Sequence, residues 1–257
     1  MHGALIAVLA VFGLAVGSFL NVVIWRVPRK LSVLRPRSQC PACGTAIRPA
    51  DNVPLVSWLC LRGRCRECRA PISARYPLVE AGCAVLFGAA GARFGWTWEL
   101  PAYLVFFAAL LSISVIDLEH HRVPGRVLVL MCAGAVLLLG LAAVGEGDGK
   151  AFGRSVLAGA VAYGGLSVAN LVFTRGVGPG DAAVSFLAGA SLGRLGWDKL
   201  LVGLLMAVLL RAVVGAALVS GRMQRGAGPL PFGPVLALAA VFTVLWGEPI
   251  VRWSSGV

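Results

Sequence analysis

Eight long apolar runs constrain the fold of this 257-residue chain more than any other feature. A helix that crosses the hydrocarbon core of a bilayer needs about 20 mostly apolar residues. No segment alternates apolar and polar residues over ten positions, which disfavours a membrane β-barrel. The sequence therefore predicts an all-α polytopic membrane protein with about eight transmembrane helices. The runs cover residues 4–25, 77–94, 101–116, 127–144, 155–173, 182–196, 200–219 and 232–250.

The composition supports the same class. Hydrophobic residues make up 58% of the chain and charged residues 13%, whereas a soluble domain carries about 25% charged residues. This excludes a disordered chain and a typical cytosolic enzyme. The net charge is +12, and eleven of the 23 basic residues lie between Arg26 and Arg75, opposed only by Asp51 and Glu67. In a membrane protein, such a loop lies on the cytoplasmic side, so we expect a lipid bilayer rather than nucleic acid as the partner.

The distribution of basic residues also predicts the orientation. With the N-terminus outside, the expected inner loops hold sixteen basic residues and the outer ends hold six. Because loops rich in Lys and Arg stay inside, this orientation is favoured. We expect a first transmembrane helix over 1–25, a cytoplasmic loop over 26–76 and a catalytic transmembrane bundle over 77–257. The 26–76 segment is called the cysteine loop below.

Four cysteines in the cysteine loop have the spacing of a metal site. Two C-x-x-C pairs are separated by 21 residues, and two such pairs can complete a tetrahedral four-thiolate zinc site, as in zinc ribbons. A reducing cytoplasm disfavours disulfides there. The alternative is two redox-active pairs or uncoordinated thiols. The predicted structural Zn²⁺ ligands are Cys40, Cys43, Cys65 and Cys68.

Two aspartates are the strongest candidates for catalysis. Asp117 ends the third apolar run and Asp181 opens the sixth, so two spans lie between them and both fall on the same membrane face. Neighbouring carboxyl groups can share one proton, because two like charges a few ångströms apart resist double ionisation. One can then accept a proton from water while the other polarises a carbonyl group. The alternative is a pair of unrelated, solvated helix ends.

Three further residues are candidates for contact with a substrate. Gly178 and Gly180 precede Asp181 and leave bare backbone that an extended substrate strand could approach. Glu80 lies one turn into the second run, where it could also act as an ordinary helix N-terminal carboxylate. Glu99 lies at an outer end, where a solvated helix cap is expected.

In their order along the chain, these motifs resemble the type IV prepilin peptidases, or leader peptidases, of the GxGD membrane aspartic proteases. The resemblance covers nearly the whole chain, which departs from the family pattern at Ala183, usually lysine, and Gly125, usually Asp or Asn. The matching segments are Gly17–Pro28, the two cysteine pairs, Ile72–Glu80, Ile116–Asp117, Gly178–Asp181 and Pro231–Pro234.

The resemblance implies a function in type IV pilus assembly or protein secretion. Members of the family sit in the bacterial inner membrane as multi-pass proteins. Their two aspartates cut the basic leader from prepilins or pseudopilins at the cytoplasmic face. Many members also methylate the new N-terminus with S-adenosylmethionine, so this cofactor is implied here by resemblance alone.

Two other functions compete with the peptidase. A non-catalytic relative that binds pilin-like helices as an assembly protein is favoured by the departure at Ala183. A proton-coupled transporter also places carboxylates within its spans. It fits less well, because both aspartates lie at one end of the bundle rather than at the midplane.

Overall fold

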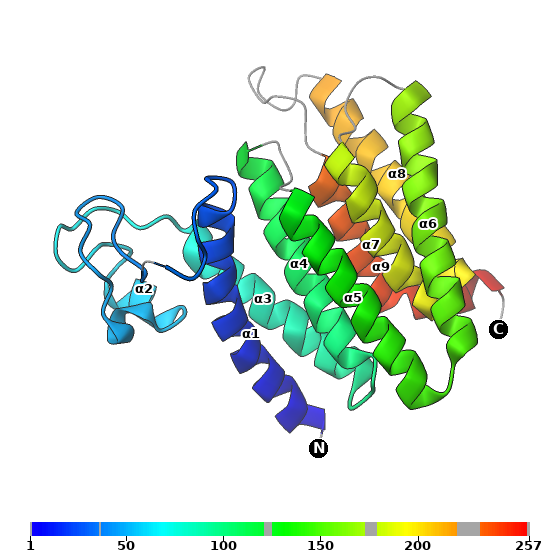
Figure 1. The fold of residues 1–257 in the computed structure, drawn as a ribbon, viewed down its shortest axis with the longest axis horizontal. Coiled ribbons are helices and arrows are strands. Elements are labelled where there is room, and N and C mark those ends of the chain that lie inside the picture. The colour runs from blue at the N-terminus through cyan, green and yellow to red at the C-terminus, as the bar shows by residue number, and fades with distance from the viewer. Residues whose placement is uncertain (1, 36, 121–124, 173–178, 220–231, 256–257) are drawn as a thin grey trace. The chain divides into compact units, whose positions relative to one another are not determined.

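The structure is a computed structural model that describes residues 2–35, 37–120, 125–172, 179–219 and 232–255. Within these residues, eight helices of 17 to 25 residues account for most of the chain (Figure 1). Two short elements lie in the cysteine loop. The elements are α1 (His2–Arg26), η1 (Pro49–Asn52), α2 (Val56–Cys60), α3 (Arg75–Phe94), α4 (Leu100–His120), α5 (Gly125–Glu146), α6 (Gly149–Val172), α7 (Pro179–Leu195), α8 (Trp197–Val219) and α9 (Phe232–Ser255).

The predicted all-α membrane fold is confirmed. Each predicted apolar run corresponds to one long helix, although the helices extend past the runs by up to several residues. Five of the helices, α1, α3, α4, α5 and α8, are long and apolar enough to cross a membrane. The apolar part of α9 is shorter and covers Phe232–Glu248.

Among the predicted helix boundaries, the start of α6 differs most from the structure. The sequence predicts this helix from residue 155, whereas the structure begins it at Gly149. Asp148 explains the difference, because its Oδ1 accepts a hydrogen bond from the backbone N–H of Ala151 at 3.0 Å. A side-chain cap of this kind satisfies one of the N–H groups that a helix leaves unpaired at its first turn. Gly147, with φ +69°, makes the turn out of α5.

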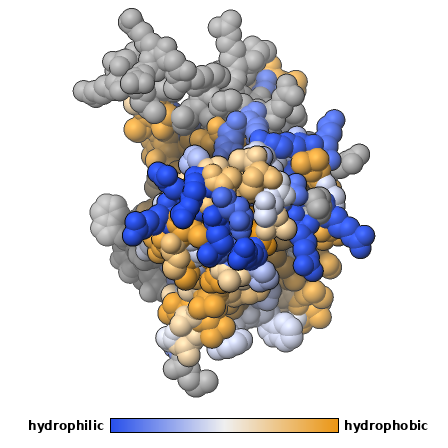
Figure 2. All heavy atoms as spheres, turned by 90° about the vertical axis from the view of Figure 1, so that its left-hand side faces the viewer, coloured by the Kyte–Doolittle hydropathy of each residue, from blue (hydrophilic) through white to orange (hydrophobic). Residues whose placement is uncertain are grey.

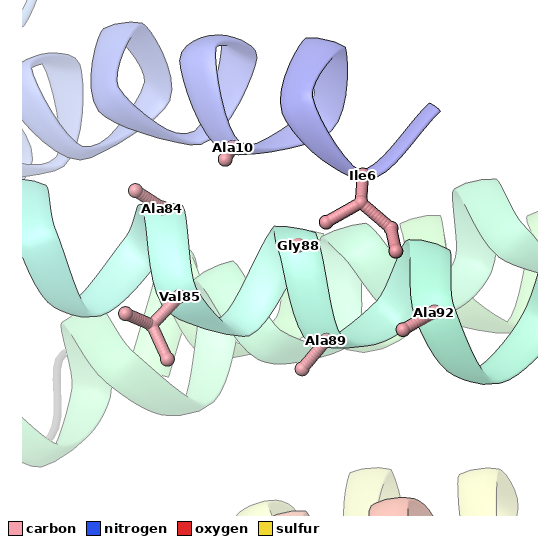
Figure 3. A pocket seen from close by; sticks show the side chains of 7 residues that line it. All are labelled: Ile6, Ala10, Ala84, Val85, Gly88, Ala89 and Ala92. Atoms are coloured by element: carbon pink, nitrogen blue, oxygen red, sulfur yellow. The ribbon is translucent and has the colours of Figure 1, made fainter. Parts of the chain in front are cut away.

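The chain divides into two compact units, residues 1–95 and 96–257. In the first unit, α1 and α3 pack closely through glycines of α1. A Cβ on Gly13 would lie 2.7 Å from the Cα of Ala84, and a Cβ on Gly17 would lie 2.7 Å from the Cα of Glu80. Small residues four positions apart allow membrane helices this close approach. The same two helices border a shallow apolar hollow lined by small side chains such as Ala10 and Ala84 (Figure 3).

In the second unit, α6 and α7 pack through small residues in the same way. A Cβ on Gly189 would lie 2.6 Å from the Cβ of Ala162, so only glycine fits this contact. Two serine hydroxyls add hydrogen bonds between the helices: Ser155 donates to the carbonyl of Ala190 at 2.7 Å, and Ser185 donates to the carbonyl of Ala162 at 3.2 Å.

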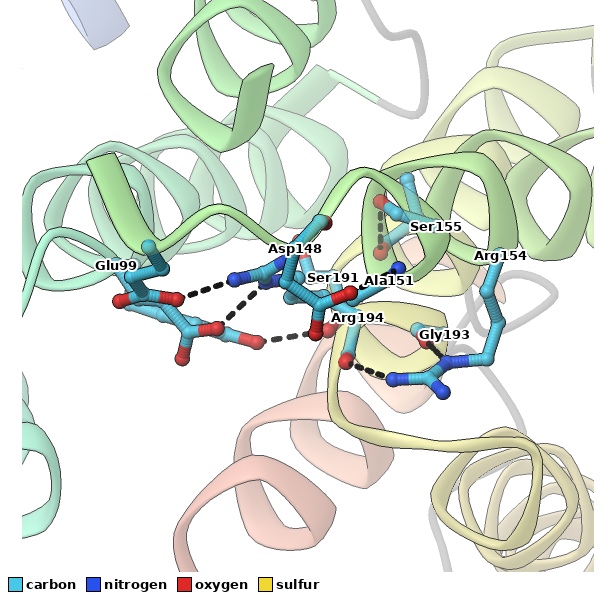
Figure 4. A network of polar contacts seen from close by, with 11 residues as sticks. Glu99, Asp148, Ala151, Arg154, Ser155, Ser191, Gly193 and Arg194 are labelled. Atoms are coloured by element: carbon cyan, nitrogen blue, oxygen red, sulfur yellow. Dashed lines mark hydrogen bonds and ion pairs between the residues drawn. The ribbon is translucent and has the colours of Figure 1, made fainter. Parts of the chain in front are cut away.

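Buried ion pairs hold α4, α5 and α7 together at the ends of α4 and α7 remote from Asp117 and Asp181 (Figure 4). The side chain of Arg194 on α7 is 2% exposed and contacts Glu99 and Glu146, each at 2.5 Å. Arg154 on α6 donates to the backbone oxygens of Gly193 and Arg194 at 2.7 and 2.8 Å. The expectation that Glu99 is a solvated cap is therefore wrong, because its partner comes from another helix.

Candidate functional site

The second unit brings the two candidate aspartates together. Asp117 lies in the last turn of α4 and Asp181 in the first turn of α7. Both are buried, with 5% and 7% of their surface exposed. Burial of two carboxyl groups is costly unless they interact or share a proton, so their position at the helix ends favours a functional role over two solvated caps.

Gly233, in the first turn of α9, lies beside both carboxyl groups. A Cβ built on this glycine would lie 2.8 Å from Asp117 Oδ2 and 3.7 Å from Asp181 Oδ1. The two carboxylate oxygens are therefore no further apart than the sum of these distances. The pair is close enough to act on one small group, such as a water molecule held between them.

The structure locates two of the three predicted substrate contacts. Gly180 is half-buried and precedes Asp181 in the first turn of α7. Gly178 lies outside the described residues. Glu80 is buried in α3, where its Oε2 accepts a hydrogen bond from the backbone N–H of Leu55 at 2.8 Å. This contact ties α3 to the cysteine loop, and a role of Glu80 toward substrate stays a prediction.

The four predicted metal ligands converge in the cysteine loop. Their sulfur atoms all lie within 4.8 Å of one another, and Cys40 Sγ lies 3.8 Å from Cys68 Sγ. A tetrahedral zinc site with bonds of about 2.3 Å has sulfur–sulfur edges of about 3.8 Å. The donor set and its spacing therefore fit a four-thiolate metal site, and none of the four cysteines is in a disulfide.

Each cysteine pair is held by the same backbone scaffold. In the first pair, Cys40 N–H donates to Thr45 O at 2.9 Å and Gly44 N–H donates to Cys40 O at 2.9 Å. In the second, Cys65 N–H donates to Ala70 O at 2.9 Å and the N–H of Arg69 donates to Cys65 O at 3.1 Å. We call these two turns, residues 38–47 and 63–72, the first and second knuckle.

The two knuckles also share an unusual backbone conformation at one position. The residue that follows the second cysteine of each pair has positive φ: +72° at Gly44 and +60° at Arg69. An isolated bridge closes each knuckle, Gln39 to Ala46 and Arg64 to Pro71. The first knuckle thus uses glycine for a left-handed position that the second fills with arginine, a side chain that rarely adopts it.

Local hydrogen bonds prepare some of these thiols for metal binding. The Thr45 hydroxyl, 3.4 Å from Cys43 Sγ, and the Thr45 backbone N–H lower the pKa of Cys43 to about 6. Backbone N–H groups of Cys68 and Glu67 lower the pKa of Cys65. For Cys68, a hydrogen bond from Ala70 is outweighed by desolvation and the neighbouring thiols, which raise its pKa to about 11. Because thiolates are the metal ligands, metal binding would release the proton of Cys68.

Ion pairs connect the second knuckle to the segment that lies between the two knuckles. Asp51 accepts two hydrogen bonds from Arg66, at 2.6 and 2.8 Å, and Arg66 in turn lowers the pKa of Asp51. Arg48 pairs with Glu67 at 2.8 Å. Both acidic residues of the cysteine loop are therefore paired within it, and hydrophilic side chains gather over this loop beside exposed apolar ones (Figure 2).

Two family models match the chain on either side of the boundary between the units. The Bacterial Peptidase A24 N-terminal domain matches residues 11–94, and the Type IV leader peptidase family matches residues 104–219. The chain belongs to the type IV leader peptidase family. The predicted resemblance is thus confirmed, and both aspartates lie in the stretch matched by the peptidase model.

Similar proteins share most of this chain's length. A prepilin leader peptidase/N-methyltransferase from Pseudomonas aeruginosa is 37% identical over 270 residues, covering 93% of this chain and 90% of that protein. A protein of the same name from Bacillus subtilis is 33% identical over 253 residues, 97% of each chain. Another from Myxococcus xanthus is 46% identical over 222 residues, 83% of this chain and 63% of its own. No solved structure matches this chain.

These similarities and the apolar helices identify a multi-pass protein of the bacterial inner membrane. Gly233 lies outside both matched stretches, and sequence reasoning noted it only within the segment Pro231–Pro234. The signal that could have found it is a glycine between two prolines at the expected start of a span, on the same membrane face as the two aspartates. That signal is weak without the structure.

Proposed function

We propose that this leader peptidase family member is a membrane aspartic endopeptidase that removes the basic leader of type IV prepilins or pseudopilins. The observation that carries this proposal is the buried pair of Asp117 and Asp181, brought together from two helices. The family and the names of the similar proteins support the substrate class.

The chemistry requires one proton shared between the two carboxyl groups. The ionised carboxylate accepts a proton from water as the water oxygen bonds to the scissile carbonyl carbon. The protonated partner gives its proton to the carbonyl oxygen, which yields a neutral gem-diol. The carboxyl group that gained a proton then gives it to the amide nitrogen, and its partner takes a proton from the diol. The carbon–nitrogen bond breaks, and the pair returns to its starting state.

Two helix N-termini surround this pair. Asp181 lies in the first turn of α7, and Gly233 brings the first turn of α9 beside both carboxyl groups. The partial positive charge at a helix N-terminus stabilises a nearby anion, typically by about 0.3–1 kcal/mol when exposed and more when buried. These two helix ends favour a negative charge at the site, whereas the last turn of α4, which carries Asp117, opposes it.

We place the aspartate pair at the cytoplasmic face of the membrane, because the distribution of basic residues favours this orientation. A prepilin would keep its apolar helix in the bilayer and its basic leader in the cytoplasm, so that its scissile bond lies at the depth of the pair. We propose that Gly178 and Gly180 allow its extended backbone to approach Asp181, with Glu80 as a further candidate contact.

The cysteine loop would hold a structural Zn²⁺ through Cys40, Cys43, Cys65 and Cys68. Bound zinc would cross-link the two knuckles, which have little apolar core of their own, and its binding energy would contribute to folding of the loop. The names of the similar proteins also support N-methylation, for which the family resemblance implies S-adenosylmethionine as the cofactor.

Co-expression with prepilins from the same genome tests the proposal, with leader removal measured as a mass shift. Wild type should remove the leader, and Asp117→Asn and Asp181→Asn should each abolish removal, because neither aspartate alone can act as both acid and base. The double variant should be no worse, since residues that act as one unit are not additive. If the prepilin stays intact with inserted wild type and with both variants alike, the proposed peptidase function is wrong.

A further inference from the structure

At Gly233 in the second unit, even a methyl group would require a neighbouring side chain to shift. The three heavy atoms nearest to a Cβ built on it are Asp117 Oδ2 at 2.8 Å, Asp117 Cγ at 3.6 Å and Asp181 Oδ1 at 3.7 Å. All three belong to the carboxyl groups of the aspartate pair. The space that a side chain of residue 233 would take therefore lies beside the two carboxyl groups that perform the proposed reaction.

The sign of φ does not require a glycine at this position, although Pro234, the next residue, disfavours a helical conformation for a preceding residue that carries a Cβ. Gly233 lies in helix α9 and, unlike Gly44 or Gly147, does not have the positive φ that favours glycine. The contact with the aspartate pair is a second reason for glycine, because it requires space rather than backbone freedom.

The start of α9 cannot easily move away from the pair. Residues 232–237 are all buried, and the guanidinium of Arg211 on α8 lies 5.0 Å from the ring centre of Phe232. A methyl group on Gly233 would therefore displace the carboxyl groups, or take the space beside them, rather than shift the helix.

We propose that Gly233 is a positioning residue that keeps open the place where the attacking water and the oxygens of the gem-diol lie. A water activated by a carboxylate lies within hydrogen-bond reach of it, at about 2.6–3.2 Å. The position of the absent Cβ is 2.8 Å from Asp117 Oδ2, which is within that reach. A side chain and a reacting oxygen atom would thus compete for one place. This inference rests on the proposed peptidase function.

The test compares Gly233→Ala with two control glycines. Gly247→Ala lies in the same helix, where its methyl group would meet side-chain atoms of Thr243 and Lys199 at 3.1 and 3.3 Å. Gly189→Ala creates a more severe clash between α6 and α7, 2.6 Å from the Cβ of Ala162 and 2.8 Å from the backbone oxygen of Ala158, without touching the aspartates. Prepilin cleavage should fall at least about 100-fold in Gly233→Ala, mainly in kcat, as expected for lost general acid–base catalysis. The two controls should keep a kcat near that of wild type, measured per folded protein.

Binding of two peptides separates this role from a structural one. Both peptides carry the prepilin cleavage sequence, but one has a tetrahedral hydroxyl in place of the scissile carbonyl and the other has hydrogen there. Wild type and both controls should bind the hydroxyl peptide at least tenfold more tightly. Gly233→Ala should bind the two peptides equally, with unchanged affinity for the peptide without the hydroxyl.

The outcomes are distinguishable. A Gly233→Ala variant that cleaves like wild type, or that keeps the preference for the hydroxyl peptide, overturns this inference while the peptidase function stands. A wild-type protein that neither cleaves prepilins nor prefers the hydroxyl peptide overturns the proposed function, and the role of Gly233 with it.

Discussion

The two knuckles of the cysteine loop allow the energetic cost of backbone strain to be compared at equivalent positions. They share the same hydrogen bonds, but the left-handed position is Gly44 in the first and Arg69 in the second. A Cβ on Gly44 would meet nothing within 4 Å, so any cost of a side chain there comes from the backbone conformation alone. We therefore expect Gly44→Ala to weaken zinc binding and Arg69→Gly to strengthen it.

The magnitude follows from the conformation. A left-handed conformation costs a residue with a Cβ roughly 1–2 kcal/mol, while the smaller freedom of alanine in the unfolded chain returns about 0.4–1 kcal/mol. The net effect is about 1 kcal/mol at each position. Where metal binding folds the loop, this energy appears in the zinc affinity, as a change of about fivefold in Kd.

The assay is competition for zinc between the detergent-solubilised full-length protein and a chromophoric chelator. Gly44→Ala should bind zinc about fivefold more weakly and Arg69→Gly about fivefold more tightly, and the double variant should resemble wild type. Arg69→Ala is the matched control, because it removes the charge but keeps the strain, and it should change little. If Arg69→Ala gains as much affinity as Arg69→Gly, charge and not strain is responsible, and the reasoning is refuted.

Three further predictions concern the loop and the second unit. Asp51→Asn should increase proteolysis of the loop at neutral pH. Arg66 lowers the pKa of Asp51, so the contribution of this ion pair to stability is present above the unfolded value of about 3.9 and is lost as pH falls through the lower folded value. The difference between wild type and variant should therefore be constant above about pH 5 and shrink below it. Arg194→Met leaves the carboxylates of Glu99 and Glu146, which are 18% and 30% exposed, without their partner. It should lower stability by about 3 kcal/mol in thermal unfolding, and Arg194→Lys should recover part of the loss. Ala183→Lys should leave prepilin cleavage unchanged or raise it, and a loss of cleavage would contradict an active site that tolerates the family lysine.

The sequence predicted those features that depend on counting along the chain. Apolar runs located the long helices, because only a continuous helix satisfies backbone groups within a bilayer. Counting the runs between Asp117 and Asp181 predicted their common membrane face, and the structure shows the two residues together. The spacing of the cysteines likewise predicted their convergence, because each short C-x-x-C turn brings two thiols to one side.

Features that depend on how the helices are rotated could not be predicted in this way. Gly233 meets Asp117 only because of the direction in which the first turn of α9 faces, and a helix that is apolar on all sides gives no pattern that fixes this rotation. Arg194 and Glu99 were each counted as residues at an outer end, since nothing in either segment shows that the two would pair.

The distribution of the aspartate pair and Gly233 over α4, α7 and α9 has a consequence for the biogenesis of the protein. A chain is synthesised from its N-terminus, and its parts fold in that order. Asp117 therefore enters the membrane first, Asp181 three helices later, and Gly233 only with α9. A nascent chain that already contains both aspartates still lacks the helix that borders them, so the order of synthesis delays the completed site until α9 has been inserted.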